Sequence, residues 1–148
     1  MTRSDLLAFL HAQKWAVQAS TSPSGAPQAA VIGVAVADDL ELVFDTMGDT
    51  RKAANLRARP SIALVVGWDD AQTVQIEGAA DEPTGDELAR LKRVYFEKFP
   101  DGPTREAWPG IAYFRVRPTW IRLSDFRGDA PRIVTWTGDA LAQLRRGE

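Results

Sequence analysis

The fold of this chain is decided by the stretch Phe44-Asp45-Thr46-Met47-Gly48-Asp49-Thr50-Arg51-Lys52-Ala53-Ala54-Asn55-Leu56. It begins as the end of a strand and continues as a helix that we expect over residues 50–58. Thr50 is a good N-cap for this helix, so Arg51 and Lys52 fall in its first turn, where the helix dipole places positive partial charge. Two cations there have the wrong sign for stability, at a cost of about 0.3–1 kcal/mol each. The segment therefore indicates that an anion offsets their charge.

A phosphate suits this helix terminus. The free N–H groups of the first turn, the hydroxyls of Thr46 and Thr50 and the two cations all supply hydrogen-bond donors to it. The alternative is that both cations point into solvent and pair with Asp45 or Asp49. Short anion-binding patterns also occur by chance, so this segment alone leaves both interpretations open.

Around this stretch the sequence predicts short strands separated by turns. The expected strands are 15–20, 29–36, 41–46, 61–68, 73–80, 113–116 and 120–123, with 132–136 as a further candidate. The expected helices are a short N-terminal one capped by Ser4, 50–58, 84–99 with apolar residues at helical spacing, and a terminal one capped by Asp139. Residues 29–36 form an apolar run without polar alternation, which is typical of a strand buried on both faces or covered by something apolar. Many short strands with few helices indicate a closed or nearly closed antiparallel barrel.

The deciding stretch also resembles a known signature. Phe44-Asp45-Thr46, separated by four residues from Arg51-Lys52 at the start of a helix, is similar to the FMN-binding signature of the pyridoxamine 5′-phosphate oxidase family. The similarity continues through Arg59-Pro60 and Gly67-Trp68 to residues 74–80, and it covers roughly residues 15 to 100. This resemblance implies a mainly β fold, a six- to seven-stranded antiparallel split β-barrel. It also implies a homodimer whose interface holds the two flavin sites.

The same resemblance implies a cofactor-binding role for particular residues. Backbone groups of Ala30, Val31 and Ile32 would lie against the flavin ring and ribityl chain. Asp45 and Thr46 would sit near the ribityl phosphate, with Thr50 beside them. Arg51 and Lys52 would bind the phosphate and the pyrimidine edge of the ring. A polar position that contacts the ring matches Thr73 or Gln75, and Trp120 would border the flavin. The full predicted set of cofactor-binding residues is Ala30, Val31, Ile32, Asp45, Thr46, Thr50, Arg51, Lys52, Thr73, Gln75 and Trp120.

Two departures put the family's reference reaction in doubt. The oxidases carry a lysine that grips the substrate phosphate where this chain has Ala35. They also have an Arg-x-His motif after the C-terminal tryptophan, whereas residues 120–126 are followed by no histidine. We therefore expect an FMN-dependent oxidoreductase of undefined substrate, with no catalytic residue assigned. The alternatives are a flavin-binding or flavin-storage protein without turnover, and a relative that uses a deazaflavin.

Composition excludes several other classes of function. With 148 residues the chain fits one domain, expected over 1–148, and its formal net charge of −2 gives no field that would recruit nucleic acid. An OB-fold for single-stranded nucleic acid would need a basic groove, which the sequence pI near 5.5 disfavours. The absence of cysteine excludes thiolate catalysis and Cys-ligated metals. We expect a cytoplasmic protein, because no signal-peptide core or membrane span is found in the sequence.

The remaining candidates are read as structural. His11 is the only histidine, so neither a metal site nor a Ser-His-Asp triad is expected. The acidic pairs Asp69-Asp70 and Asp81-Glu82 are read as solvated hairpin tips. Five tryptophans are many for this length, and we expect most of them in the core or at the dimer interface.

Overall fold

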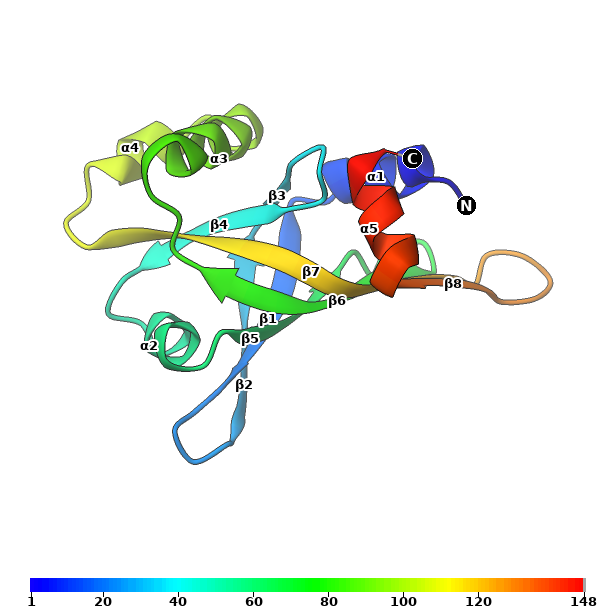
Figure 1. Cartoon of the computed structure of the whole chain (residues 1–148), viewed down its shortest axis with the longest axis horizontal. Coiled ribbons are helices and arrows are strands. Elements are labelled where there is room, and N and C mark those ends of the chain that lie inside the picture. Colours follow the sequence, from blue (N-terminus) through cyan, green and yellow to red (C-terminus); the bar gives the residue numbers. More distant parts are fainter. Residues whose placement is uncertain (148) are drawn as a thin grey trace.

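An antiparallel sheet organises residues 1–147, the part of the chain that the computed structural model describes (Figure 1). Its neighbouring strands follow the order β2-β1-β5-β6-β7-β4-β3, and β8 pairs with β7 off this path. The strands are β1 (Trp15–Thr21), β2 (Pro27–Gly33), β3 (Ala35–Val36), β4 (Leu42–Met47), β5 (Ser61–Val66), β6 (Gln72–Asp81), β7 (Ile111–Asp125) and β8 (Arg132–Thr137). The mainly β prediction is confirmed, with eight strands in place of six or seven.

The sheet curls because its two edge strands are joined directly in sequence. β2 and β3 stand at opposite ends of the strand order, yet only Val34 separates them. The long strand β7 supports the curl by pairing with β6, β4 and β8. A bulge between Glu77 and Gly78 bends β6 where it meets β7. A Cβ at Gly78 would lie 2.3 Å from the carbonyl oxygen of Arg117, so only glycine permits this approach.

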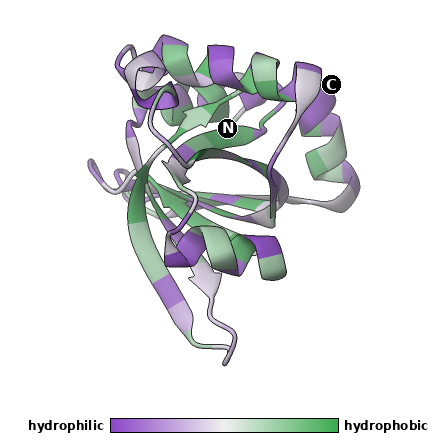
Figure 2. Ribbon diagram, turned by 90° about the vertical axis from the view of Figure 1, so that its left-hand side faces the viewer, coloured by the Kyte–Doolittle hydropathy of each residue, from purple (hydrophilic) through white to green (hydrophobic). Residues whose placement is uncertain are grey.

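Five helices cover the half-barrel, and Figure 2 shows them with alternating hydrophobic and hydrophilic segments, as expected for elements that bury one face. They are α1 (Arg3–Ala12), α2 (Arg51–Ala58), α3 (Gly85–Lys98), α4 (Gly102–Glu106) and α5 (Gly138–Arg146). α2 packs on β1 and β6, whereas α3 packs on β3, β4 and β7. The sheet and these helices bury two hydrophobic clusters. The larger includes Phe44 stacked on Phe114 at 5.6 Å, and the smaller joins Ala35 to Tyr95 and Phe99 under α3. No helix within residues 1–147 is both long and apolar enough to cross a bilayer.

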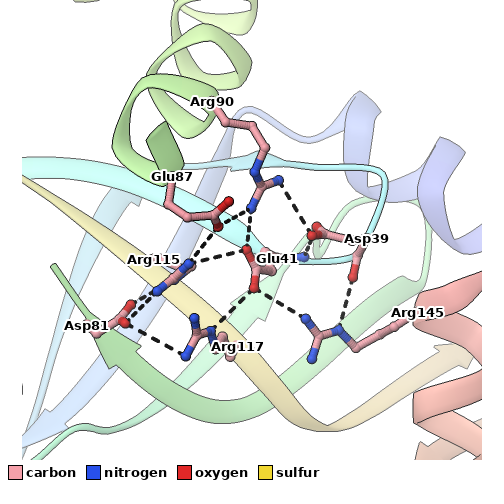
Figure 3. A network of polar contacts seen from close by, with 8 residues as sticks. All are labelled: Asp39, Glu41, Asp81, Glu87, Arg90, Arg115, Arg117 and Arg145. Carbon is pink, nitrogen blue, oxygen red and sulfur yellow. Dashed lines mark hydrogen bonds and ion pairs between the residues drawn. The ribbon is translucent and has the colours of Figure 1, made fainter. Parts of the chain in front are cut away.

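A network of ion pairs ties the helices to the sheet (Figure 3). Its centre is Glu41, which is 5 % exposed and lies just before β4. Arg90 of α3 reaches this carboxylate at 2.6 Å, and Arg145 of α5 reaches it at 3.3 Å. Arg115 of β7, itself buried, pairs with Asp81 at the end of β6 at 2.7 Å. The network contains four arginines and four acids, and the buried Glu41 is one of these acids. It joins α3, α5, β6 and β7.

Most expected elements are confirmed within two residues, but four boundaries are wrong. The apolar run 29–36 is two strands, interrupted at Val34, whose N–H bonds the carbonyl of Lys14. The two strands expected at 113–116 and 120–123 are one, because Pro118 pairs opposite Gly78 at the bulge and does not end the ladder. α1 is capped by Thr2 rather than Ser4, through a capping box with Asp5. α5 takes Thr137 as its N-cap residue and Asp139 lies in its first turn.

Two side-chain expectations also need correction. Asp81 and Glu82 are not merely solvated, because they pair with Arg115 and Arg57. The tryptophans, expected in the core or at the dimer interface, do not lie in the core, so the dimer interface is the place that stays a prediction for them. Three of them, Trp15, Trp68 and Trp108, are about half exposed in the chain, and no tryptophan belongs to the buried core of the described residues. The short α4 has no counterpart among the expected elements.

Candidate functional site

A polar pocket of about 400 Å³ lies between the β1–β2 ribbon and the N-terminus of α2. It is lined by Gln18, Ser20, Gln28, Ala29, Ala30, Asp49, Thr50, Arg51 and Lys52. Four of the predicted cofactor residues therefore meet in one place: Ala30, Thr50, Arg51 and Lys52. The antiparallel register explains the meeting, since Ala30 lies opposite Gln18 and shares its face of the ribbon.

Thr50 organises the helix end of this pocket. Its hydroxyl accepts the N–H of Ala53 at 3.3 Å and donates to the carbonyl of Met47 at 2.9 Å. The hydroxyl of Thr46 lies 3.3 Å from the same oxygen, which places this predicted residue next to the cap. With the cap satisfied, the N–H groups of Arg51 and Lys52 remain without a partner inside the helix.

The two cations are not neutralised by the protein. Within residues 1–147 the side chains of Arg51 and Lys52 form no ion pair, and α2 has no acid in its first turn. The interpretation in which they pair with Asp45 or Asp49 is therefore wrong. Asp49 lines the pocket as its one carboxylate, so the described lining carries a formal charge of +1. Dipole and side chains together favour an anion here.

Asp45 belongs to a different environment. Successive strand residues point to opposite faces, so the side chains of Asp45 and Thr46 cannot both reach the cap. The Asp45 carboxylate accepts a hydrogen bond from the hydroxyl of Tyr95 and pairs with Arg105, each at 3.0 Å. It is absent from the lining of the pocket and anchors α3 and α4 to β4.

Three other predicted residues, Val31, Gln75 and Trp120, lie on the opposite face of the sheet. Val31 pairs with Val17, and Val17 lines a second pocket of about 300 Å³ with Gln75 and Trp120. The guanidinium of Arg122 lies over the Trp120 ring at 5.0 Å, and Glu77 lines the same pocket. Within one chain the sheet itself therefore separates these three predicted residues from Arg51 and Lys52.

Two further predicted residues contact neither pocket. Ile32 is buried in the core, and Thr73 lies on β6 with its hydroxyl buried and without a partner in the described chain.

Sequence reasoning missed the amides and hydroxyl that line the strand side of the first pocket. Gln18 and Ser20 are almost completely buried and alternate with Val17 and Ala19 along β1. Polar residues in phase with a buried Ala16 were the available signal, because a core-facing position normally carries an apolar side chain. Their presence marks a polar floor inside an otherwise apolar half-barrel.

The donors of this pocket fit a ligand that carries a phosphate, because two cations and a helix N-terminus meet there. The same pocket holds a buried acceptor without a partner, the Oε1 atom of Gln18. The volume lies within the range of small-molecule sites, about 300–1,000 Å³. Among the described residues no group of three or more His, Asp or Glu side chains is arranged to hold a metal ion. The observations define a curled antiparallel half-barrel with a basic pocket at a helix terminus.

Comparison with known proteins identifies the family. The sequence profile described as pyridoxamine 5′-phosphate oxidase matches residues 3–125, and the chain belongs to this family. A pyridoxine/pyridoxamine 5′-phosphate oxidase of Burkholderia vietnamiensis is 32% identical over 91 residues, which are 61% of this chain and 41% of that protein. The chain thus spans about two fifths of the length of this relative.

Solved structures confirm the split-barrel fold. A heme binding protein from Mycobacterium smegmatis superposes with a TM-score of 0.80 at 19% identity, covering 96% of this chain and 60% of that one. An FMN binding protein related to pyridoxamine 5′-phosphate oxidase, from Nostoc punctiforme, gives a TM-score of 0.66 at 13% identity. That alignment covers 91% of this chain and 84% of the other. At such identities the likeness establishes the fold alone.

Proposed function

We propose that this protein binds FMN and acts as a flavin-dependent oxidoreductase. The observation that carries the proposal is the pair Arg51 and Lys52 at the N-terminus of α2, unpaired within the described chain and lining a pocket of suitable size. Riboflavin lacks the anion that these groups would bind, and the family includes FMN-binding members such as the Nostoc protein. FMN is therefore the form of the flavin expected to bind best.

The residues divide the binding task among them. Arg51 and Lys52 would bind the phosphate, and Thr50 keeps their helix terminus in place through its cap. The strand face at Ala30 closes the other side of the pocket. A bound flavin supplies two-electron redox chemistry that no amino-acid side chain provides. The protein's own part is to hold the ligand and to exclude water from it.

A homodimer would complete the site. Val31, Gln75 and Trp120 lie across the sheet from Arg51, so the second face of one subunit must serve the pocket of another if all of them are to contact one ligand. This face exposes apolar side chains that such a contact would cover, with Val31 63 % exposed and Trp120 only partly covered. Covering this surface by a second copy would bury it from water.

Titration with FMN tests the binding proposal. We expect FMN to bind more tightly than riboflavin, as measured by quenching of flavin fluorescence. Arg51→Ala should weaken FMN about ten- to a hundredfold, the loss expected for one charge-assisted contact. Arg93→Ala is the matched control, because Arg93 is an exposed arginine on α3, outside the pocket lining. Unchanged FMN affinity in both Arg51→Ala and Lys52→Ala would exclude the phosphate assignment.

A second candidate function is flavin storage without turnover. It is favoured by Ala35, which is 2 % exposed and offers no charged group toward a substrate. Anaerobic addition of NADH or NADPH separates the two functions. Bleaching of the flavin absorbance within seconds supports the oxidoreductase, whereas a flavin that stays oxidised supports storage. Binding of a deazaflavin in place of FMN, identified by mass spectrometry of the ligand carried from cells, would indicate the third alternative.

A further inference from the structure

Gln18 is a buried amide that the folded chain leaves unsatisfied. The residue is 1 % exposed, at the middle of β1, and its Oε1 atom has no hydrogen-bond partner in the described part of the chain. An unpaired buried polar group is costly, and most such groups in native proteins do have partners. An apolar residue would serve the core better at this position. The amide therefore calls for a partner that the chain itself does not provide.

The nearby side chain of Asn55 is a buried amide whose hydrogen bonds are all made within the protein, in contrast to Gln18. Asn55, 4 % exposed on α2, donates to Ser20 at 3.1 Å and to Gln28 at 2.9 Å. Its oxygen accepts from Arg59 at 3.4 Å. Every polar atom of this side chain is thus engaged with the protein. Gln18 lies on the same strand as Ser20, two residues away, yet it takes no part in these contacts.

The free carboxamide of Gln18 lines the same pocket as Arg51 and Lys52. A phosphate bound by these cations is an acceptor and cannot donate to the Oε1 atom. The group that meets the Oε1 atom must therefore be a donor on another part of the ligand. A hydroxyl is suitable, because its O–H group donates to an amide oxygen.

We infer that Gln18 binds a hydroxyl-bearing segment next to the phosphate of the ligand. The pocket is then selective for a phosphorylated polyol or sugar over free phosphate, and Gln18 is a specificity-determining residue. This inference rests on the proposed function, in which the ribityl chain of FMN is that segment. Of the two buried amides, Gln18 on β1 and Asn55 on α2, only Gln18 is expected to contribute to this selectivity.

The test replaces each amide by an apolar residue of similar size and measures two quantities. Gln18→Met, or Gln18→Leu if the first variant expresses poorly, should weaken FMN about three- to tenfold, as expected for a neutral hydrogen bond. Its melting temperature without ligand should stay unchanged or rise by roughly 2–6 °C, since an unsatisfied buried group is removed. Asn55→Leu is the matched control and should lower the melting temperature, because it breaks three satisfied contacts.

Inorganic phosphate separates the inference from the proposed function. Its competition against FMN should be weakened by Arg51→Ala and should be unchanged by Gln18→Met. Equal FMN affinity in Gln18→Met and wild type would overturn the inference, and so would an equal loss of phosphate affinity, because Gln18 would then contact the phosphate itself. A lower melting temperature of Gln18→Met with unchanged FMN affinity would show a structural residue. Failure of wild-type protein to bind FMN would instead overturn the proposed function, and the inference with it.

Discussion

Tyr95 donates a 3.0 Å hydrogen bond from its phenolic hydroxyl to the Asp45 carboxylate, joining α3 to β4. Burial, reinforced by the negative charge of Asp45, raises the pKa of Tyr95 well above its ordinary value, so the phenol remains a donor throughout the physiological pH range. The second carboxylate oxygen pairs with Arg105 of α4 at 3.0 Å. One aspartate thus connects three elements while its neighbour Thr46 faces the helix cap.

We therefore predict that Asp45 contributes to stability rather than to FMN affinity. Asp45→Ala should lower the free energy of unfolding by about 1.5–3 kcal/mol, the range for hydrogen bonds to charged groups. FMN affinity should change by less than about twofold in the folded variant, a difference well below the loss of one hydrogen bond. Urea unfolding and flavin titration measure the two quantities. If Asp45→Ala had normal stability and bound FMN much more weakly, the prediction would be wrong and Asp45 would belong to the phosphate-binding residues.

Much of the fold was predictable from sequence because its signals are local. The cap at Thr50 and the strand lengths around it follow from residue types alone. Asp45 shows the limit. Sequence places it beside Thr46, but its partners Tyr95 and Arg105 lie 50 and 60 residues away. Only the fold decides which face of β4 meets which helix.

Two strand predictions also fail because long-range contacts are not visible in the sequence. Pro118 normally ends a ladder, yet here the bulge at Gly78 accommodates it within β7. The apolar run 29–36 predicts a strand buried on both faces or covered by something apolar. In the single chain Val31 is 63 % exposed, so burial by the chain itself is excluded and the apolar cover stays a prediction. The polar phase of Gln18 and Ser20 becomes a signal only once Ala16, on the same face of β1, is known to be buried.

The ion-pair network around Glu41 should make stability depend on acid. Hydrogen bonding to Arg115 holds the pKa of Asp81 below its ordinary value. Hydrogen bonding to Arg90 lowers the pKa of Glu87 in the same way. A carboxyl group with a lower pKa in the folded chain binds protons more readily when unfolded. Its stabilisation is therefore complete above the unfolded pKa, near 4, and is lost as pH falls through the lower folded value.

We expect the free energy of unfolding to fall steeply below about pH 4. The double variant Asp81→Asn with Glu87→Gln should be less stable than wild type at pH 7 and should lose less on acidification. Asp86→Asn is the control, since Asp86 is an exposed carboxylate of the same helix without an ion pair in the described residues. Denaturant unfolding at pH 7, 4 and 3 provides the comparison. Parallel acid profiles for the double variant and wild type would contradict the prediction.

Val31 offers a test of the proposed dimer. An acid at this exposed edge-strand position would be buried and unpaired at an interface between two copies, at a cost of several kcal/mol. We expect wild type to have twice the chain mass of 16.3 kDa by light scattering, and Val31→Asp to have the mass of one chain. FMN should bind more weakly to Val31→Asp, because Gln75 and Trp120 of a second subunit are then missing.

Ala89→Asp, at an exposed position on α3, is the matched control and should remain dimeric. Wild-type protein of 16.3 kDa at micromolar concentration, with flavin still bound, would contradict the dimer. It would also require that one chain binds FMN through Arg51 and Lys52 without the opposite face of the sheet.

The last prediction concerns the reaction that gives the family its name. We expect this protein not to oxidise pyridoxamine 5′-phosphate at an ordinary enzymatic rate. A substrate phosphate needs cations beside the flavin, and Ala35 is an apolar residue packed in the cluster of Tyr95 and Phe99. Lys98 lines the same small pocket as Ala35, but its ammonium donates to the carbonyl oxygens of Leu10, His11 and Gln13, so it is committed to the end of α1.

Losing two charged contacts to the substrate costs several hundredfold or more in kcat/KM, at about 1.5–3 kcal/mol each. The assay follows pyridoxal phosphate formation from pyridoxamine phosphate with oxygen and saturating FMN, and a kcat/KM well below about 10⁴ M⁻¹s⁻¹ is expected. A value at or above that figure would show that other cations, such as Arg122 beside Trp120, bind the substrate from another direction. Arg122→Ala would then abolish the activity, whereas Arg93→Ala, which changes an exposed arginine of α3, would leave it intact.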